Sequence, residues 1–533
     1  MMVKVDGCNA SFRITKAFYP PDANFADAPS WIELQVQVEN WNSETTLTVS
    51  IEEIDAVSVN KKCPLLSFKN KKARDSFRSA LISELSDGLE NKTIELGYYF
   101  SKTGATVFAD GSVCFLRGAE LLGSCSRPYL VAPEYGNTRL LGDGEISGEI
   151  LSLLLDSQFP VLLVFAYVLL TSVRSLLIGS EIDLQAILYI EGGQGLGKTT
   201  LATRVAGIYE NDGKRTGIVQ AGSTLSAVNA MMVSLRDQPL IVDDLCLSVS
   251  RDTARKRIDL ASKLIRQATG NIPIIKQHGK TTEQLPCEAG IILTAEFSLE
   301  NMSDLTRCLI VPVKNRMDLP GGLKPEVIGE AVRHYSSWFS AHSEEEIKRF
   351  RSTVEEYIGS YPELDVRMGT NYACLEAAFQ SFVRSMACED ANGYYSKRLS
   401  QKMRSAIQYA QEEHMALVEK IKSAIPVGNL TYCIQQGYCN EEFNLCKKAE
   451  KLHKHDGILW KGDLCLKPNA LIPFVRRQPG YRDWSSRRIV QELKDIGALV
   501  IQEESAATVH IIKDAPRVYR IHLEALKNAA ERY

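Results

Sequence analysis

The first 94 residues carry two segments in which apolar and polar positions alternate. They are WIELQVQVEN (residues 31–40) and TLTVSIEEID (residues 46–55), and their period of two predicts strands with one buried face. A basic amphipathic helix is predicted at residues 69–88, where the Lys and Arg side chains either form a solvated face or contact nucleic acid. We therefore expect residues 1–94 to form a β-rich domain. Short strands between glycine turns predict a small β adaptor at residues 95–145.

A helical pattern covers residues 144–179 and contains a long apolar stretch. Residues 159–170 are twelve apolar residues without interruption, with Gln158 before them and Thr171 after them. A helix that crosses a membrane needs about 20 such residues, so a helix buried in a protein core is the better interpretation. We expect no membrane association.

The segment ILYIEGGQGLGKTT (residues 187–200) begins as an apolar strand and ends in glycines followed by Lys198 and Thr199. It matches G-x-x-x-x-G-K-[ST], the pattern of a phosphate-binding loop between a strand and a helix. Glycines leave backbone N–H groups free to wrap phosphates, Lys198 can reach the β and γ oxygens, and the Thr199 hydroxyl can ligate Mg²⁺. The alternative is a glycine turn without a ligand. The predicted ATP-binding residues are Gly192, Gly193, Gln194, Gly195, Leu196, Gly197, Lys198, Thr199 and Thr200.

Two further apolar strands are predicted to end in polar residues. Residues 240–242 lead into Asp243 and Asp244, about 45 residues after Lys198. One carboxylate there can hold Mg²⁺ together with Thr199, and the second can polarise the attacking water. The strand at residues 290–297 carries Thr294 near its end, which we predict to contact the γ-phosphate or the water. The alternative is an ordinary polar residue at a strand end.

Arg307 enters another apolar strand in SDLTRCLIVPV. In ring-forming ATPases an arginine at this place can reach the γ-phosphate bound by the neighbouring subunit, where its charge stabilises the transition state. We predict this role for Arg307, with Arg316 as the reserve. The role requires a homo-oligomer, for which we expect a hexamer.

Residues 251–280 contain eight basic and two acidic residues, a net charge of +6. Apolar residues at helical spacing predict a helix that Asp252 can cap and Gly270 can end. IIKQHGKTTEQL then predicts a β-hairpin. A basic hairpin can grip the phosphates of a DNA strand threaded through a ring, and the alternative is a surface hairpin without a ligand. The predicted tip residues are Lys276, Gln277, His278, Gly279 and Lys280, of which Lys276, His278 and Lys280 are the DNA contacts.

The C-terminal part divides into two predicted regions. Residues 323–425 predict helices that suit a lid on the core, in which Arg367 is either a nucleotide-sensing arginine or a surface residue. Residues 426–533 predict a winged-helix region, because a helix that starts at Ser485 is followed by two strand-like runs. We expect Arg487 and Arg488 near the helix start to contact DNA, whereas many winged helices bind only proteins.

Bulk composition limits the class of protein. A chain of 533 residues predicts three or four domains. The 62 basic and 65 acidic residues, net charge −3, argue against a surface coated by polyanions but allow local basic patches. The start MMVKVDGCNA lacks the apolar region of a signal peptide, and thirteen scattered cysteines fit reduced thiols in the cytoplasm. The Cys and His of residues 433–465 lack paired zinc-ligand spacing, so we expect buried thiols.

The order GGQGLGKTT, LIVDDL, KQHGK, IILTAE and TRCLIV resembles the AAA+ hexameric helicases. It is most similar to the MCM-like helicases of bacterial mobile elements such as staphylococcal cassette chromosomes, and it shares its Asp-Asp pair and Lys/His hairpin with superfamily-three viral helicases. The resemblance covers about residues 95–320. It implies an α/β fold with a P-loop AAA+ ATPase core at residues 146–322 and a role in replicating a mobile element. One departure is Asp244, where many AAA+ proteins have Glu.

We therefore expect an ATP-driven, ring-forming DNA helicase that uses ATP and Mg²⁺. A rival is a protein-remodelling or defence-signalling AAA+ ATPase, but rings that thread protein usually expose an aromatic pore loop and KQHGK has none. A primase–helicase fusion is a third possibility, and residues 1–145 contain no acidic constellation typical of a polymerising site. The predicted catalytic residues are Lys198, Asp243, Asp244, Thr294 and Arg307.

Overall fold

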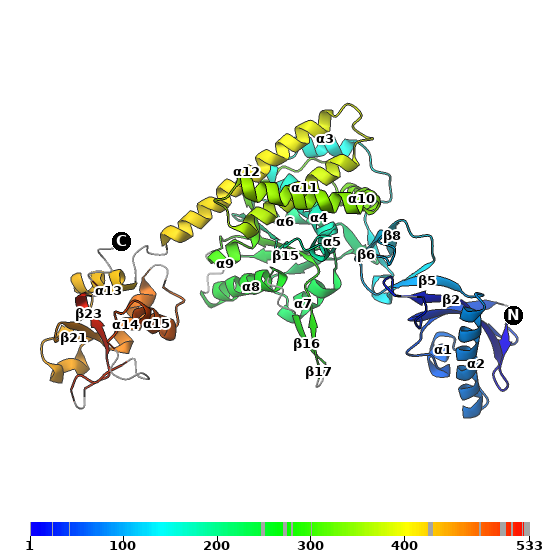
Figure 1. Cartoon of the computed structure of the whole chain (residues 1–533), viewed down its shortest axis with the longest axis horizontal. Helices are drawn as coiled ribbons and strands as arrows, with labels where there is room; N and C mark the ends of the chain where they lie inside the picture. Colours follow the sequence, from blue (N-terminus) through cyan, green and yellow to red (C-terminus); the bar gives the residue numbers. More distant parts are fainter. Residues whose placement is uncertain are drawn as a thin grey trace. The chain divides into compact units, whose positions relative to one another are not determined.

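The computed structural model describes residues 2–246 except 24 and 42, 251–269, 274–278, 281–299, 301–424, 430–478, 481–500, 508–512, and 515–526 except 525. Contacts within the chain define two compact units. The first contains residues 1–299 and 303–413, and the second contains residues 300–302 and 414–533. Figure 1 labels the helices and strands of both.

The N-terminal part of the first unit is a twisted sheet with two helices against one face. The strands run in the order β4-β3-β2-β5-β9, and β1 pairs with β2. The predicted strand at residues 46–55 stops at Ser50, because Asp55 instead caps a helix by accepting a hydrogen bond from Ser58 N (2.7 Å). The elements are β1 (Val3–Lys4), β2 (Ala10–Tyr19), β3 (Trp31–Val38), β4 (Glu44–Ser50), α1 (Ala56–Lys62), α2 (Lys71–Glu90), β5 (Glu95–Phe100) and β9 (Tyr129–Val131).

The alternation noted in the sequence decides which face of this sheet is buried. In β3 every second residue is buried, and α2 covers that face with Phe77 against Phe12, ring centroids 4.9 Å apart. The helix predicted at residues 69–88 is confirmed as α2, capped by the Asn70 side chain. β5 and β9, which come from the region expected to form the adaptor, extend this same sheet in parallel with β2.

Three short antiparallel strands form a second sheet between the N-terminal sheet and the rest of the unit. They are β6 (Gly104–Val107), β7 (Val113–Arg117) and β8 (Glu120–Gly123). A separate three-stranded sheet joins β10 (Thr138–Leu140) to β12 (Tyr209–Asn211) and β13 (Lys214–Arg215). These strands therefore connect the residues before 145 directly to the central sheet region.

The central part of the first unit is a five-stranded parallel sheet, in the order β14-β15-β18-β11-β19. Its inner strands β15, β18 and β11 are mostly buried, which explains their continuous apolar runs. The elements are α3 (Glu149–Asp156), α4 (Phe159–Ser172), α5 (Arg174–Gly179), β11 (Ile187–Gly192), α6 (Lys198–Ala206), β14 (Ile218–Gln220), α7 (Leu225–Ser234), β15 (Pro239–Leu245), α8 (Arg251–Thr269), β16 (Ile274–His278), β17 (Thr281–Leu285), β18 (Gly290–Ala295), α9 (Met302–Leu305) and β19 (Cys308–Val313).

The apolar stretch at residues 159–170 is confirmed as a buried helix. Every residue of α4 from Val161 to Ser172 is buried, and α4 packs against α6, α10, α11 and β19. Within the described part of the chain, no helix has both the length and the apolar character that a membrane span requires.

Three long helices cover the central sheet on the side of α4 (Figure 1). α10 (Pro325–Ser360) is interrupted at His342, α11 (Val366–Ser385) is almost wholly buried, and α12 (Tyr394–Ala424) follows. Buried Glu346 of α10 accepts a hydrogen bond from Arg384 Nε of α11 (3.1 Å), which satisfies its charge. Helices thus occupy the region in which a lid was predicted.

The second unit surrounds a core of its own. Its sheet has the order β20-β21-β22-β23, and Leu499 forms an isolated bridge to Ile521 beside it. The helix predicted from Ser485 is confirmed as α15, but the two predicted runs after it fall partly on residues 501–507 and 513–514, outside the described residues. The elements are α13 (Leu430–Cys439), β20 (Leu445–Cys446), β21 (Gly457–Trp460), β22 (Asp463–Leu466), α14 (Pro468–Arg477), α15 (Ser486–Asp495) and β23 (Tyr519–His522).

Candidate functional site

The glycine loop (residues 192–197) connects β11 to α6 at the carboxyl edge of the parallel sheet. Gly195 and Gly197 have φ values of 75° and 92°, which other residues rarely adopt. A Cβ on Gly192 would lie 2.4 Å from the Val313 carbonyl oxygen, so this strand end accepts only glycine without rearrangement. The residue types of the predicted P-loop are thus required by its backbone.

Lys198 begins α6 with its side chain folded over the glycine loop. Its Nζ donates hydrogen bonds to the carbonyl oxygens of Gly192 (2.8 Å) and Gly193 (2.7 Å), and the residue is only 8% exposed. An ammonium group therefore lies beside the backbone that would wrap a phosphate.

Asp243 joins three elements at the same edge of the sheet. Its Oδ1 accepts a hydrogen bond from Thr199 Oγ1 of α6 (2.9 Å) and another from Thr294 Oγ1 of β18 (2.6 Å). β18 lies between β15 and β11 in the sheet. The residue is 5% exposed, so these bonds form in a largely desolvated place.

Asp244 lies next to this junction in an unusual backbone conformation. Its φ is 69°, and the pairing of β15 with β18 shifts register between Val242 and Leu245. The Asp244 N–H donates to Thr294 Oγ1 (3.0 Å), whereas its side chain is exposed at the edge of the sheet. The bulge therefore directs the two adjacent carboxylates to different surroundings.

The residues fit ATP and Mg²⁺ on chemical grounds. The glycine loop can approach phosphate closely, and Mg²⁺ bound to a nucleotide needs only one or two protein oxygens beside phosphate and water. Thr199 and Asp243 supply a hydroxyl and a carboxylate oxygen 2.9 Å apart. The described residues contain no cluster of three or more His, Cys, Asp or Glu suited to an all-protein metal cage.

The structure separates the two candidate arginines. Arg307 precedes β19, and its carbonyl oxygen accepts from Ile187 N at the amino edge of the sheet, about 17 Å along β11 from the glycine loop. Its guanidinium Nη1 contacts Ser303 Oγ (2.5 Å). Arg316 instead lies at the glycine loop, because the adjacent Met317 N donates to Leu196 O (2.9 Å). Arg307 is therefore remote from the glycine loop of its own chain.

The predicted hairpin is present as β16 and β17. Its register pairs His278 with Thr281 and Lys276 with Glu283. Gly279 and Lys280, the predicted turn, lie outside the described residues. The preceding helix begins at Arg251, one residue before the predicted cap Asp252. The hairpin, which follows α8 and precedes β18 in the chain, projects away from the central sheet (Figure 1).

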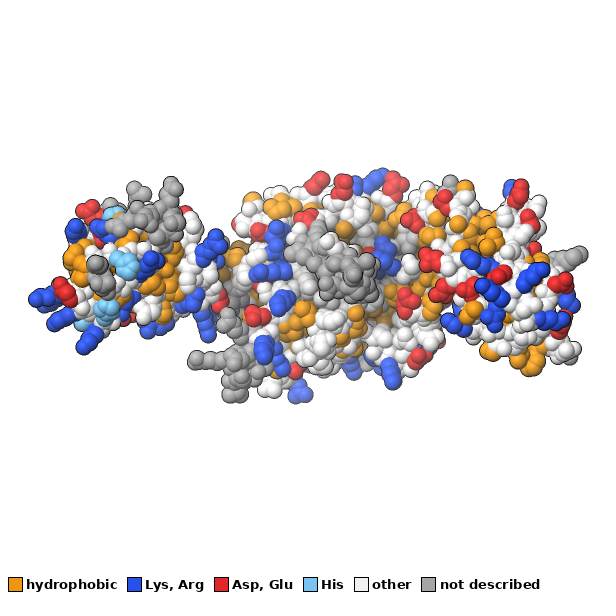
Figure 2. All heavy atoms as spheres, turned by 90° about the horizontal axis from the view of Figure 1, so that it is seen from below, with side chains coloured by type: hydrophobic (Ala, Val, Ile, Leu, Met, Phe, Trp, Pro, Cys, Tyr) orange, Lys and Arg blue, Asp and Glu red, His pale blue; other side chains and the backbone are white. Residues whose placement is uncertain are grey.

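The second unit carries the other predicted DNA contacts. Arg487 and Arg488 are exposed at the start of α15, and the Arg488 guanidinium lies 4.1 Å from the centre of the Trp484 ring. Residues 414–533 contain nineteen basic and fourteen acidic residues, a net +5 in a chain of net −3. Figure 2 shows Lys and Arg side chains on the surface of this unit.

Remaining predicted residues have ordinary surroundings. Arg367 is exposed near the start of α11. All thirteen cysteines are free thiols, and burial raises the pKa of Cys374 and of Cys465 to about 12, which keeps both protonated at neutral pH.

Two polar contacts near the site carried no signal in the sequence. Glu191, the residue before the glycine loop, accepts a hydrogen bond from Ser298 Oγ (2.5 Å), which follows β18. Arg257 of α8 donates from Nη1 to Asp244 O (3.2 Å). Neither belongs to a motif, and Arg257 is one of several cations in a basic helix.

The fold of this chain occurs in a solved structure described as "SCCmec type IV Cch - active helicase". The two chains are 16% identical, and their alignment covers 98% of this chain and 96% of the other with a TM-score of 0.57. At this identity the likeness shows a shared fold, and it extends over nearly the whole length, beyond the residues 95–320 to which the sequence resemblance applied. A structure of JCV helicase bound to an N-phenylacetamide compound gives a TM-score of 0.19 at 12% identity, over 46% of this chain and 60% of that one, and carries no argument. No protein-family model and no curated protein matches the chain.

Proposed function

We propose that this protein is an ATP-driven DNA helicase that works as a ring, most consistently a hexamer. The observation that carries the proposal is the junction of Thr199, Asp243 and Thr294 beside the glycine loop. Three elements from distant parts of the sequence contribute one oxygen-rich site at the edge of a parallel sheet. The shared fold with a structure described as an active helicase supports the same conclusion.

Each residue has a distinct part in ATP hydrolysis. The glycine loop and Lys198 bind the phosphates, and Thr199 and Asp243 hold Mg²⁺, which neutralises phosphate charge when bound. Exposed Asp244 polarises the attacking water. Thr294 orients both acidic residues, through the Asp243 carboxylate and the Asp244 backbone N–H. The desolvated setting of Asp243 keeps this arrangement fixed during turnover.

Arg307 supports a ring rather than a monomer. It lies at the sheet edge opposite the glycine loop, which favours a site on another copy of the chain as the target of its guanidinium. The hairpin of β16 and β17 contacts single-stranded DNA in the centre of the ring through Lys276, His278 and Lys280. The second unit has the order α13, β20, β21, β22, α14, α15, Leu499 bridge and β23. We assign its last part, from α14 onward, to a winged helix that binds DNA through Arg487 and Arg488.

We place this activity in the cytoplasm, in the replication of a mobile genetic element. A second candidate is a protein-remodelling or defence-signalling AAA+ ATPase, in which the hairpin would engage a polypeptide. The basic composition around the hairpin favours nucleic acid, since eight of ten charged residues in 251–280 are basic.

The test combines one variant with one ligand comparison. Lys198→Ala should abolish both ATP turnover and unwinding, because it removes the charge that stabilises the transferred phosphate. Lys214→Ala, an exposed lysine of β13, is the matched control and should change neither. ATPase rates are measured with no DNA, with single-stranded DNA and with duplex DNA, alongside the mass of the assembly. Turnover that ignores DNA would favour the remodelling candidate.

A further inference from the structure

The Asp244 backbone is held in a conformation that it does not favour by itself. A φ of 69° is rare for a residue with a Cβ, and such strain persists only where surrounding contacts maintain it. Two contacts do so here. The Asp244 N–H donates to Thr294 Oγ1 (3.0 Å), and its carbonyl oxygen accepts from Arg257 Nη1 (3.2 Å).

Arg257 holds more than one point of this turn. The same Nη1 donates to Cys246 O (3.1 Å) and contacts Cys246 Sγ, while Sγ lies 3.8 Å from Asp244 Oδ2. One guanidinium group thus contacts the backbone on both sides of Leu245. These contacts are all made by one nitrogen, Nη1, and the charge of the group that carries it is permanent in arginine.

The helix that carries Arg257 is also fixed further along its length. Ser262 Oγ donates to Asp304 Oδ2 (2.6 Å), and Arg266 Nε donates to Asp304 Oδ1 (2.9 Å). Asp304 is buried, and it stands three residues before Arg307. At its C-terminal end, the end nearer Ser262 and Arg266, α8 leads to β16, the first strand of the hairpin. It therefore spans from the Asp244 turn to the segments that carry the hairpin and Arg307.

We propose that Arg257 is a positioning residue that couples the Asp244 turn to α8, and through α8 to the hairpin. This inference rests on the proposed ATPase and DNA-translocase function. It adds a physical connection between the ATP site and the DNA-binding hairpin. When contacts of Thr294 or Asp244 change with the bound nucleotide, the strained peptide rotates and its carbonyl leaves Arg257. The rotation frees or shifts α8, so hydrolysis is communicated to the DNA-binding hairpin.

The functional test compares Arg257→Ala and Arg257→Lys with Lys256→Ala, an exposed lysine of the same helix. Arg257→Ala should bind ATP with a Kd within about threefold of the parent, and its DNA-independent turnover should fall less than its DNA-stimulated turnover. Most of the stimulation of its ATPase rate by single-stranded DNA should be lost, and its unwinding rate should fall at least about tenfold. Both effects are expected because a misplaced positioning residue lowers reaction rates more than it weakens ATP binding. Arg257→Lys, whose ammonium group offers three donors at one nitrogen, should restore part of the stimulation, and Lys256→Ala should match the parent. Normal unwinding per ATP by Arg257→Ala would overturn the inference.

A stability cycle tests the contact without relying on activity. Arg257→Ala should lower the Tm of the parent protein, and it should lower the Tm less in an Asp244→Gly background, where the left-handed backbone no longer requires support. If Arg257→Ala lowered the Tm equally in the parent and in the Asp244→Gly variant, the coupling would be contradicted. This measurement requires folded protein but no enzymatic activity. The proposed ATPase function is tested separately: it would fail if Lys198→Ala left ATP turnover unchanged.

Discussion

Thr294 contacts both acidic residues of the site through one hydroxyl group. It donates to Asp243 and accepts from the Asp244 backbone, so the same oxygen fixes a charged side chain and a strained peptide. Because hydroxyl groups can donate and accept at once, only Thr or Ser fits this place.

Removal of that hydroxyl should slow hydrolysis more than it weakens ATP binding. Thr294→Val keeps the shape of the side chain but leaves the Asp244 N–H and one bond to Asp243 unmade. We expect kcat to fall about 10- to 100-fold with KM for ATP within about threefold, and stability to fall by about 1–3 kcal/mol. Thr294→Ser, which keeps the hydroxyl, should retain most of the activity. Steady-state ATPase kinetics and urea unfolding measure both effects, and a parental kcat for Thr294→Val would contradict the role.

Among single residues, those that belong to a motif of fixed spacing could be predicted from the sequence. The glycines, Lys198, Thr199, Asp243 and Thr294 meet as expected because strand ends in a parallel sheet lie at one edge. Arg257 could not be predicted, since its identity as a contact depends on the bulge at Asp244. A bulge arises from tertiary pairing and has no signature in local periodicity.

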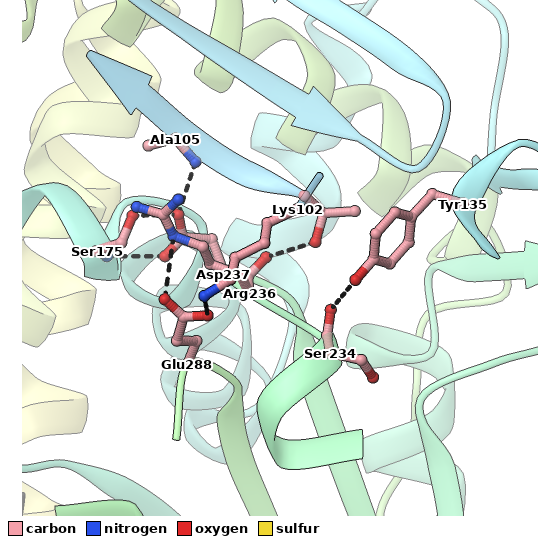
Figure 3. A network of polar contacts seen from close by, with 9 residues as sticks. Lys102, Ala105, Tyr135, Ser175, Ser234, Arg236, Asp237 and Glu288 are labelled. Carbon is pink, nitrogen blue, oxygen red and sulfur yellow. Dashed lines mark hydrogen bonds and ion pairs between the residues drawn. The ribbon is translucent and has the colours of Figure 1, made fainter. Parts of the chain in front are cut away.

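Among the elements, the short sheet of β6–β8 is bound to the central sheet by a polar network (Figure 3). Asp237 is completely buried, and its carboxylate accepts from Ala105 N (2.8 Å) and Ser175 N (2.7 Å). Its carbonyl oxygen accepts from buried Arg117 Nη1 (3.0 Å). Lys102 and Arg236 both pair with Glu288, which precedes β18. The strands of residues 104–123 are therefore attached at the amino edge of the sheet.

Loss of this attachment should destabilise the first unit. Asp237→Ala removes the acceptor of two buried N–H groups, and we expect a loss of about 2–4 kcal/mol in the first unfolding transition. Asp212→Ala is the matched control, because Asp212 also has a positive φ (49°) but is exposed. Its expected cost is below about 1 kcal/mol. Urea unfolding followed by circular dichroism distinguishes them, and equal losses would show that the network adds no stability.

The elements themselves follow closely from periodicity. The strand at residues 31–40, the buried helix at 159–170 and the helices α2, α8 and α15 lie where the pattern predicted them. Two misses have physical causes. α1 was not predicted because it is a short helix begun by a cap, and the membership of β5 in the N-terminal sheet depends on a parallel pairing across more than 70 residues.

For the molecule as a whole, the proposed role of Arg307 requires that copies of the chain cooperate. Arg307→Ala should be inactive, and mixing it with Lys198→Ala should restore about a quarter of the turnover if subunits assemble at random in a ring. The restored sites combine an intact glycine loop from one variant with an intact Arg307 from the other. Arg316→Ala should give no such rescue, because Arg316 lies at the glycine loop of its own chain.

The mixture is measured as ATPase rate against mixing ratio, with the mass of the assembly recorded at each point. An inactive mixture in a fully assembled ring would contradict a contribution from the neighbouring subunit. The sequence alone could indicate the arginine but not its distance from the loop, since that distance depends on which end of β19 pairs with Ile187.

The burial of α4 has a consequence for how the protein is made. The surfaces that cover α4 include α10 and α11, and α11 ends at Ser385, more than 200 residues after α4. At about 5–20 residues per second, a ribosome needs roughly 10–40 seconds to produce that cover. During this interval the nascent chain presents one of its most apolar helices to the cell. Its synthesis should therefore depend on a holding chaperone, and premature termination before residue 385 should yield an aggregating fragment rather than a smaller folded one.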